Sequence, residues 1–229
     1  MDLPPPELPG LLLVDVLDAA GGDGLVPAAA AALALGCRPL PVALAAGGET
    51  LPAPTIHAQF DLARTLGRPR AARLGRLGGA AALVAGVLRD RAAGPVVVGV
   101  EGREDLEALS GPLRELSALV IVRAASLPEL FGIDPDGTPS LARAAAALRA
   151  RGAGTALVGG AFHRGRVLDL IDEGGAVTVL DTGRIRAPRR EGLSSAHAVA
   201  VAAHLARGAG AARAAEAAQR YLAHRLEAG

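Results

Sequence analysis

Short apolar runs alternate with longer helical segments along almost the whole chain. Strands are expected where such a run is bounded by glycine or another turn residue. Strands that alternate with helices form a largely parallel sheet covered on both faces, which predicts an α/β fold with three αβα layers. The expected strands are 11–17, 38–45, 71–77, 94–100, 118–122 and 154–160, and the expected helices are 24–36, 54–67, 78–91, 103–116, 126–132 and 138–152.

Local signals add detail to this pattern. The prolines of segment 38–45 indicate an edge strand or an irregular start. Ser126 is expected to cap the helix that it begins, and Thr138 or Ser140 is expected to cap the helix that follows.

A hairpin signal appears late in the chain. Residues 165–183 contain two alternating halves around a Glu-Gly-Gly turn, which predicts antiparallel strands at one edge of the sheet. Two helices, 194–208 and 211–228, are expected after it. No internal repeat or linker interrupts the pattern, so we expect a single domain over residues 11–229 after a Pro-rich lead, residues 1–10.

The composition restricts both the core and the chemistry. The chain is 51% hydrophobic but only 2% aromatic, so its core must be built from Ala, Val and Leu. All 24 basic residues are arginines, which leaves no lysine for a P-loop or for Schiff-base chemistry. The net charge is +1 and the signs are interleaved. The one arginine cluster, residues 184–190, lacks aromatic neighbours and indicates a solvated loop, so no nucleic-acid partner is expected.

The cysteine count and the lengths of the apolar runs indicate the cellular location of the protein. Cys37 is the single cysteine, which excludes a disulfide framework and a thiolate metal site within the chain. Residues 1–10 lack the basic segment of a signal peptide, and the longest apolar run, near residues 25–36, is too short to span a bilayer. We expect a cytoplasmic protein that makes no membrane contact and binds a small molecule.

Three glycine-rich turns follow expected strands, at residues 18–24, 158–162 and 191–196. Ligands of open α/β sheets bind beyond the carboxyl ends of strands, where glycine allows the backbone to approach an anion or a flat ring. Neither GxGxxG nor GxxxxGK[ST] occurs in the sequence, which counts against a dinucleotide-binding fold and a P-loop NTPase.

The order of these elements and turns resembles the ribokinase-like superfamily, and within it the hydroxymethylpyrimidine and phosphomethylpyrimidine kinases of thiamine biosynthesis. The turn that begins at Asp18 resembles that family's D-P-S-G-G-A-G, and Gly36-Cys37 resembles the G-C before its second strand. "RLGR" resembles K-I-G-M, "SLPE" resembles N-x-x-E, "VGG" resembles K-G-G, and "GLSS" resembles G-T-G-C. The likeness covers nearly the whole chain.

The resemblance implies a ribokinase-like fold, ATP and Mg²⁺ as cofactors of an active enzyme, and a homodimer. It also assigns residues to the parts of a kinase site. The substrate pocket would contain Asp18, Gly21, Gly22, Ala28, Gly47 and Arg76. The nucleotide and Mg²⁺ region would contain Ser126, Glu129, Val158, Gly159 and Gly160. The anion hole would contain Gly192, Leu193 and Ser194, and Ser195 would occupy the catalytic position.

Several of these positions depart from the family pattern. Ser195 replaces the catalytic cysteine, and a serine hydroxyl is a far weaker base at neutral pH. The family's pocket aspartate, glutamine and methionine fall at Ala28, Gly47 and Arg76. The asparagine of N-x-x-E becomes Ser126, and the lysine of K-G-G becomes Val158.

These departures predict a kinase-related protein with a degraded site and little or no phosphorylation of thiamine precursors. One alternative is a noncatalytic binding or assembly module on the kinase fold. The other alternative is a divergent ATP-dependent kinase for another small alcohol.

Histidines and acids give no separate metal site. His197 lies two residues after Ser195, and positions i and i+2 of a helix do not face each other, so a Ser–His relay is not expected. His197 is interpreted as a partly exposed helix residue, and His57, His204 and His224 as surface or boundary residues. No spacing of His, Cys, Asp or Glu indicates a site held by the protein alone.

Overall fold

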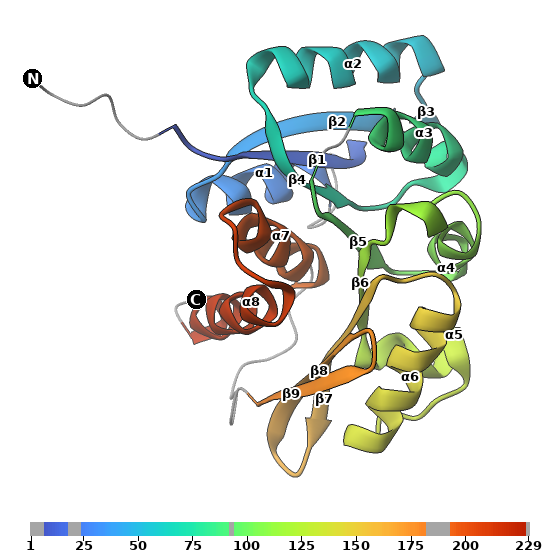
Figure 1. Ribbon diagram of the computed structural model, residues 1–229, viewed down its shortest axis with the longest axis vertical. Helices are drawn as coiled ribbons and strands as arrows, with labels where there is room; N and C mark the ends of the chain where they lie inside the picture. The colour runs from blue at the N-terminus through green and yellow to red at the C-terminus, as the bar shows by residue number, and fades with distance from the viewer. Residues whose placement is uncertain (1–6, 18–23, 92–93, 182–192, 228–229) are drawn as a thin grey trace, which may run out of the picture.

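The computed structural model describes residues 7–17, 24–91, 94–181 and 193–227 (Figure 1). Its strands form one nine-stranded sheet in the order β3-β2-β1-β4-β5-β6-β7-β8-β9. The strands are β1 (Gly10–Leu17), β2 (Arg38–Ala46), β3 (Glu49–Thr50), β4 (Pro69–Leu74), β5 (Val96–Val100), β6 (Leu119–Arg123), β7 (Thr155–His163), β8 (Arg166–Glu173) and β9 (Ala176–Asp181). β2, β1, β4, β5, β6 and β7 pair in parallel, whereas β3, β8 and β9 pair with antiparallel neighbours. The predicted α/β class and the late hairpin are confirmed.

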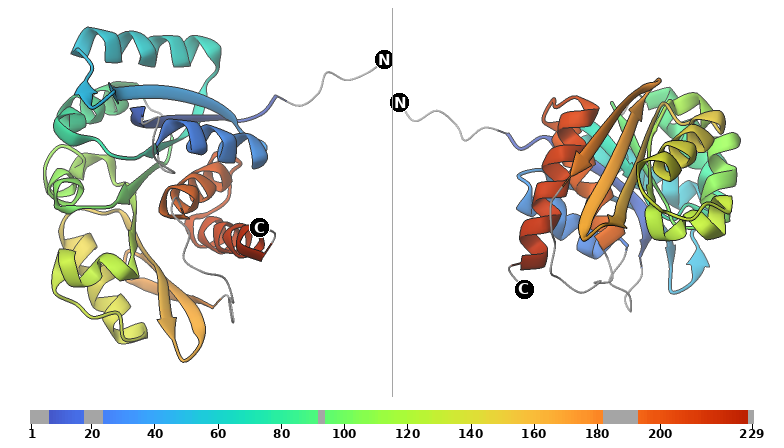
Figure 2. Two further views of the ribbon diagram at one scale, coloured as in Figure 1. Left: turned by 180° about the vertical axis from the view of Figure 1, so that it is seen from behind. Right: turned by 90° about the horizontal axis from the view of Figure 1, so that it is seen from below.

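Helices cover both faces of the sheet (Figure 2). The helices are α1 (Leu25–Ala34), α2 (Ala53–Leu66), α3 (Ala81–Arg91), α4 (Arg103–Ser110), α5 (Leu127–Phe131), α6 (Thr138–Ala150), α7 (Leu193–Ala206) and α8 (Ala211–Glu227), and short 3-10 turns lie at Gly78–Ala80, Arg114–Leu116 and Ala124–Ser126. One core lies between the sheet and the helices from α2 to α6, and a second lies between the sheet and α1, α7 and α8. Both cores consist mainly of Ala, Val and Leu, as the composition requires.

The prolines of β2 are explained by its position. β3 pairs only with Ala45 and Ala46, so no described strand pairs with the outer side of β2 at its prolines. Further along, the side chain of Gln59 on α2 accepts a hydrogen bond from the Ala43 N–H (2.8 Å) and donates one to the Ala43 carbonyl (3.0 Å). A side-chain amide thus replaces a neighbouring strand at this edge.

The expected helix caps are wrong in their chemistry. Ser126 occupies the N-cap position of α5, but its side chain makes no capping hydrogen bond. The N-cap residue of α6 is Gly137, with φ of 105°, rather than Thr138 or Ser140. The Ser140 hydroxyl instead donates to the Gly137 carbonyl (2.8 Å), because a serine one turn inside the helix can reach back to that oxygen.

β1 marks the point where the strand order reverses. The chain runs from β1 outward to β2 and then returns to place β4 on the other side of β1. β1 is thus followed by a strand on one side of it, and β4 by β5 on the other side, and ligands of open α/β sheets bind at such a point, beyond the carboxyl ends of the strands. The fold positions its candidate site there.

Candidate functional site

A buried ion pair joins β1 and β4 at this switch point. The Nη1 atom of Arg73 on β4 contacts Oδ2 of Asp15 on β1, and the side chains of both residues are only 2% exposed. The other carboxylate oxygen, Oδ1, accepts hydrogen bonds from the N–H groups of Val16 (2.7 Å) and Arg76 (3.2 Å). The Arg76 guanidinium lies at the outer side of the pair, with its Nε 4.0 Å from the same oxygen. Both Asp15 oxygens therefore have donors, as a buried carboxylate requires.

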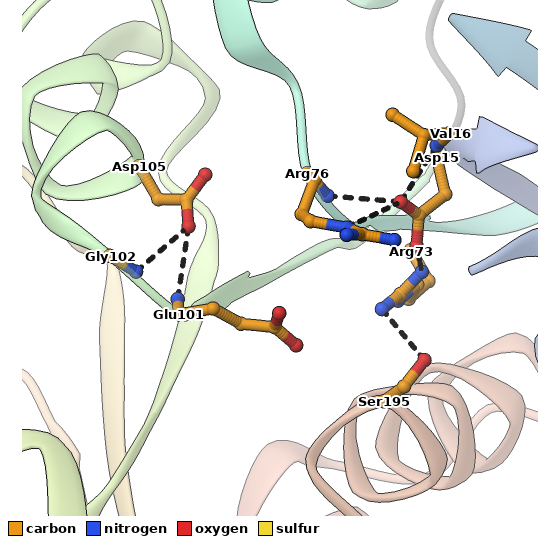
Figure 3. Close-up of polar contacts among 8 residues, drawn as sticks. All are labelled: Asp15, Val16, Arg73, Arg76, Glu101, Gly102, Asp105 and Ser195. Atoms are coloured by element: carbon orange, nitrogen blue, oxygen red, sulfur yellow. Dashed lines mark hydrogen bonds and ion pairs between the residues drawn. The ribbon is translucent and has the colours of Figure 1, made fainter. Parts of the chain in front are cut away.

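The same arginine reaches the first turn of α7. Arg73 Nη2 donates a hydrogen bond to Ser195 Oγ over 2.9 Å, and Ser195 is buried (Figure 3). Asp15, Arg73 and Ser195 thus form one polar network that connects two strands with the helix N-terminus.

Gly75 is the residue that leaves room for this network. A Cβ at this position would lie 2.6 Å from Arg73 Nη1 and would overlap the Asp15 carboxylate. Because real Cβ atoms do not approach other atoms so closely, a larger residue would displace the ion pair.

A second carboxylate lies in the first turn of α4, shortly after β5. Asp105 Oδ2 accepts hydrogen bonds from the N–H groups of Glu101 (2.9 Å) and Gly102 (3.2 Å), which fixes the start of α4 (Figure 3). Burial raises the pKa of Asp105 above its ordinary value, and these two N–H donors oppose the rise. The charges of Glu104 and Asp15 also raise this pKa.

His197 is buried, which corrects the sequence interpretation of a partly exposed residue. It is 7% exposed and lies against Gly159 on β7 and Asp169 on β8. Burial lowers the pKa of His197, whereas the charge of Asp169 opposes that change. The sequence interpretation failed because α7 is apolar around most of its circumference and packs against both the sheet and α8.

Several proposed site residues are apolar, lack a side chain, or lie away from the Asp15–Arg73–Ser195 network. Ala28 is buried in the core between α1 and α7, Val158 is completely buried, and Gly47 lies exposed in the turn after β2 with φ of 59°. Near the end of β6, Ser126 is half-buried and Glu129 is exposed on α5.

Other proposed residues lie beside the Asp15–Arg73 pair or His197, belong to the backbone of α7, or fall outside the residues that the structure describes. Arg76 adjoins the Asp15–Arg73 pair, Gly159 contacts His197, and Gly160 is exposed in the irregular part of β7. Leu193 and Ser194 belong to the backbone of α7. Four proposed residues, Asp18, Gly21, Gly22 and Gly192, lie outside the described residues.

Asp15 and Arg73 were missed by sequence reasoning. A signal was present, since Asp15 is the single charged residue of the apolar run "LLLVDVL", and Arg73 lies among apolar residues in "AARLGRL", whose other arginine, Arg76, comes after β4. Central parallel strands are covered on both faces, so a charge within one must be buried and paired. Opposite signs in two such strands indicate that they pair with one another.

Within the described parts of the chain, no group of three His, Cys, Asp or Glu residues could hold a metal ion. No helix there is both long and apolar enough to cross a bilayer.

Comparison with known proteins places this geometry in context. The family model described as phosphomethylpyrimidine kinase matches residues 45–229. No curated protein matches the sequence.

Solved structures resemble the fold closely. The Staphylococcus aureus pyridoxal kinase in complex with AMP-PCP and pyridoxal superposes with a TM-score of 0.84 at 21% identity, covering 96% of this chain and 89% of that one. The Bacillus subtilis pyridoxal kinase, an ADP complex, gives 0.82 at 20% identity and covers 94% and 90%. A phosphomethylpyrimidine kinase from Clostridium difficile 630 gives 0.75 at 19% identity and covers 96% and 100%.

Proposed function

Because this chain belongs to the phosphomethylpyrimidine kinase family, we propose that it binds ATP–Mg²⁺ and a small molecule near the β1–β4 switch point, with little or no phosphorylation of hydroxymethylpyrimidine. The hydrogen bond from Arg73 Nη2 to Ser195 Oγ carries this proposal. Ser195 stands at the family's cysteine position, where a kinase needs a group that removes the proton of the substrate alcohol.

Arg73 cannot activate this serine. A guanidinium remains protonated in proteins and donates hydrogen bonds only, so it cannot accept the hydroxyl proton. Its bond to Ser195 Oγ uses an oxygen lone pair and weakens the serine as a proton acceptor. Assistance by a general base is typically worth ~10²–10⁴ in rate, which is the deficit expected here.

No neighbouring group replaces the missing base among the described residues. The carboxylate of Asp15 already accepts bonds from Arg73, Val16 and Arg76. His197 lies on another side of α7, against Gly159 and Asp169, and is buried there.

The proposed substrate pocket also lacks polar side chains where the family has them. Ala28 presents a buried methyl group, and Gly47 has no side chain. A pyrimidine that loses its water contacts there without replacement loses about 1–3 kcal/mol for each unpaired group. We therefore expect weak binding of hydroxymethylpyrimidine.

The nucleotide region fits ATP–Mg²⁺ only in part. When bound, ATP–Mg²⁺ would supply the phosphoryl group. The exposed Glu129 carboxylate would hold the hydrated metal and the exposed backbone at Gly160 would adjoin the nucleotide, because these groups are open to solvent. Val158 offers no charge to the phosphates, since its side chain is apolar and buried. These features favour binding over catalysis.

A coupled ADP-release assay tests the catalytic part of the proposal. The native protein and Ser195→Cys would be assayed with ATP–Mg²⁺ and hydroxymethylpyrimidine, with the Clostridium difficile phosphomethylpyrimidine kinase as the positive control. We expect neither protein to exceed the no-enzyme rate, because Arg73 and the apolar pocket remain in the variant. Turnover by the native protein would contradict the proposal.

Calorimetry with AMP-PCP–Mg²⁺ tests the binding part separately. Absence of any binding heat would contradict nucleotide binding and favour a noncatalytic binding or assembly module on the kinase fold.

Parallel ADP-release assays with pyridoxal and other small alcohols address the second candidate function, a divergent kinase. That candidate is favoured by Arg76, whose side chain is 41% exposed beside the buried Asp15–Arg73 pair and offers a positive charge to a ligand more polar than a pyrimidine.

A further inference from the structure

A second buried polar group lies on the opposite side of α7 from Arg73. His197 projects toward β7 and β8, where a Cβ at Gly159 would lie 3.2 Å from its Cε1 and 3.4 Å from its Nδ1. The same position lies 3.4 Å from Asp169 Oδ1, so imidazole and carboxylate flank one glycine. The Nε2 atom of His197 is buried and has no hydrogen-bond partner among the described residues. A buried polar atom of this kind is costly and calls for an explanation.

Asp169 fixes the backbone beside that glycine. Its Oδ1 accepts a hydrogen bond from the Gly160 N–H over 2.6 Å. Burial raises the pKa of Asp169, whereas the charge of His197, the Gly160 N–H and the side chain of Gln219 on α8 oppose that rise. Gly159 and Gly160 lie within the irregular stretch of the β7–β8 pairing, between Val158 and Ala161. Because ladder hydrogen bonds are interrupted in such a stretch, the Asp169 carboxylate anchors backbone that the sheet does not hold.

The charged surroundings of His197 are simple. Asp169 on β8 is the titratable group that acts on it among the described residues. β7 contributes the backbone of Gly159, and α8 contributes the uncharged Gln219. On the β1 and β4 side of α7, Asp15 and Arg73 are engaged with each other and with Ser195. A proton on His197 is therefore felt mainly by Asp169.

We propose that His197 is a positioning residue whose protonation sets the geometry of the Gly159–Gly160 backbone through Asp169. With a neutral imidazole, the Asp169 carboxylate serves the Gly160 N–H. An imidazolium attracts that carboxylate and competes with the amide, which loosens the anchor. Burial lowers the pKa of His197, so the neutral form dominates at neutral pH and the change occurs on acidification.

The consequence for ligand binding rests on the proposed nucleotide binding, since Gly160 adjoins the region assigned to the nucleotide. Ser195 and His197 lie on one helical turn, fixed to Arg73 on one side and contacting the Gly159 backbone on the other. Loosening of the Gly160 anchor at low pH then weakens nucleotide affinity without any change in the Arg73–Ser195 bond.

An NMR titration of the ligand-free protein tests the positioning role directly. The Gly160 amide resonance would be followed from pH 8 to pH 5 in the native protein, His197→Gln and His197→Asn. His57→Gln, which changes an exposed histidine on α2, is the matched control. We expect the amide shift to move with one inflection below pH 6.5, the ordinary histidine value, in the native protein and the control. The inflection should be lost in both His197 variants.

Three outcomes would overturn the proposal. They are an unchanged Gly160 titration in a folded His197 variant, a flat Gly160 shift in the folded native protein, and unfolding of the native protein before the amide moves. Two variants are used so that a fold defect in one of them leaves the other informative.

Calorimetry with ADP at pH 7.5 and pH 5.5 gives the functional arm. We expect a loss of affinity at the lower pH in the native protein and no such loss in His197→Gln. A pH-dependent loss of the same size in the variant would contradict the link to the nucleotide. Absence of ADP binding at both pH values would contradict the proposed function, whereas the NMR result would still decide the role of His197.

Discussion

The guanidinium of Arg73 donates a hydrogen bond to the hydroxyl of Ser195 over 2.9 Å and connects β4 to the first turn of α7. Its other terminal nitrogen is paired with Asp15. One buried side chain therefore fixes both the switch point and the helix that begins beside it.

Replacing Arg73 with methionine should destabilise the protein strongly. The change removes the buried partner of the ion pair and leaves the Asp15 carboxylate with only the partly exposed Arg76 guanidinium 4.0 Å away, and breaking a buried pair in this way costs about 3–5 kcal/mol in free energy of unfolding. Urea denaturation measures this loss. Arg70→Met, an exposed position on the same strand, should stay within about 0.5 kcal/mol of the native protein. A double variant, Asp15→Val with Arg73→Met, should lose less than Arg73→Met alone, because no unpaired charge remains. Equal losses in the two would argue against the pair.

Gly75→Ala should also destabilise the protein. The added methyl group overlaps the Asp15–Arg73 pair, and overpacking of this kind typically costs about 1–3 kcal/mol. Gly86→Ala is the matched contrast, since this helix position has open space around it and alanine favours a helix by about 0.5–1 kcal/mol. Urea denaturation should therefore give changes of opposite sign, and equal effects would show that Gly75 is not tightly packed.

His197 should make stability fall on acidification. Its pKa is lower in the folded protein than in the unfolded chain, so the unfolded chain binds more protons as the pH falls below about 6.5. The free energy of unfolding then decreases through that window down to the folded pKa. In His197→Gln this contribution is absent. As the pH is lowered from 7.5 to 5, the free energy of unfolding of the variant should therefore rise relative to that of the native protein. A constant difference across this range would contradict the assignment.

Gln59→Ala should weaken the edge of the sheet. The change leaves the N–H and carbonyl of Ala43 without the side-chain amide that serves both, at a cost of about 1–3 kcal/mol if water does not replace it. His57→Ala, an exposed position on the same helix, should have a small effect. Thermal unfolding of the two variants provides the comparison, and similar melting temperatures would show that water satisfies this edge.

Much of the fold could be predicted because each strand and helix leaves a local pattern. Apolar runs such as "GPVVVGV" and the Gly-Gly turn at 174–175 indicate their structures without reference to the rest of the chain. The two-residue β3 leaves no such pattern, because it is too short for an alternation to appear.

The candidate site was less predictable because its contacts are long-range. Asp15 and Arg73 are 58 residues apart in sequence. The pattern of apolar residues predicts where strands lie along the chain, but it does not predict which strands become neighbours in the sheet. The burial of His197 depends on a helix that is covered on two sides, by the sheet and by α8, and α8 follows it in the chain. A helix that is apolar on most sides was the available sign of such burial.

The core beneath α1, α7 and α8 joins opposite ends of the chain, because β1 and α1 come early whereas α7 and α8 come last. During synthesis on the ribosome, the strands can assemble and receive α1 and the helices from α2 to α6, while the part of this face of the sheet that α7 and α8 cover remains exposed. The nascent chain therefore carries an open apolar surface until residues 193–227 have emerged, and such surfaces attract chaperones or other nascent chains. The last two helices therefore protect the protein from aggregation as well as completing its second core.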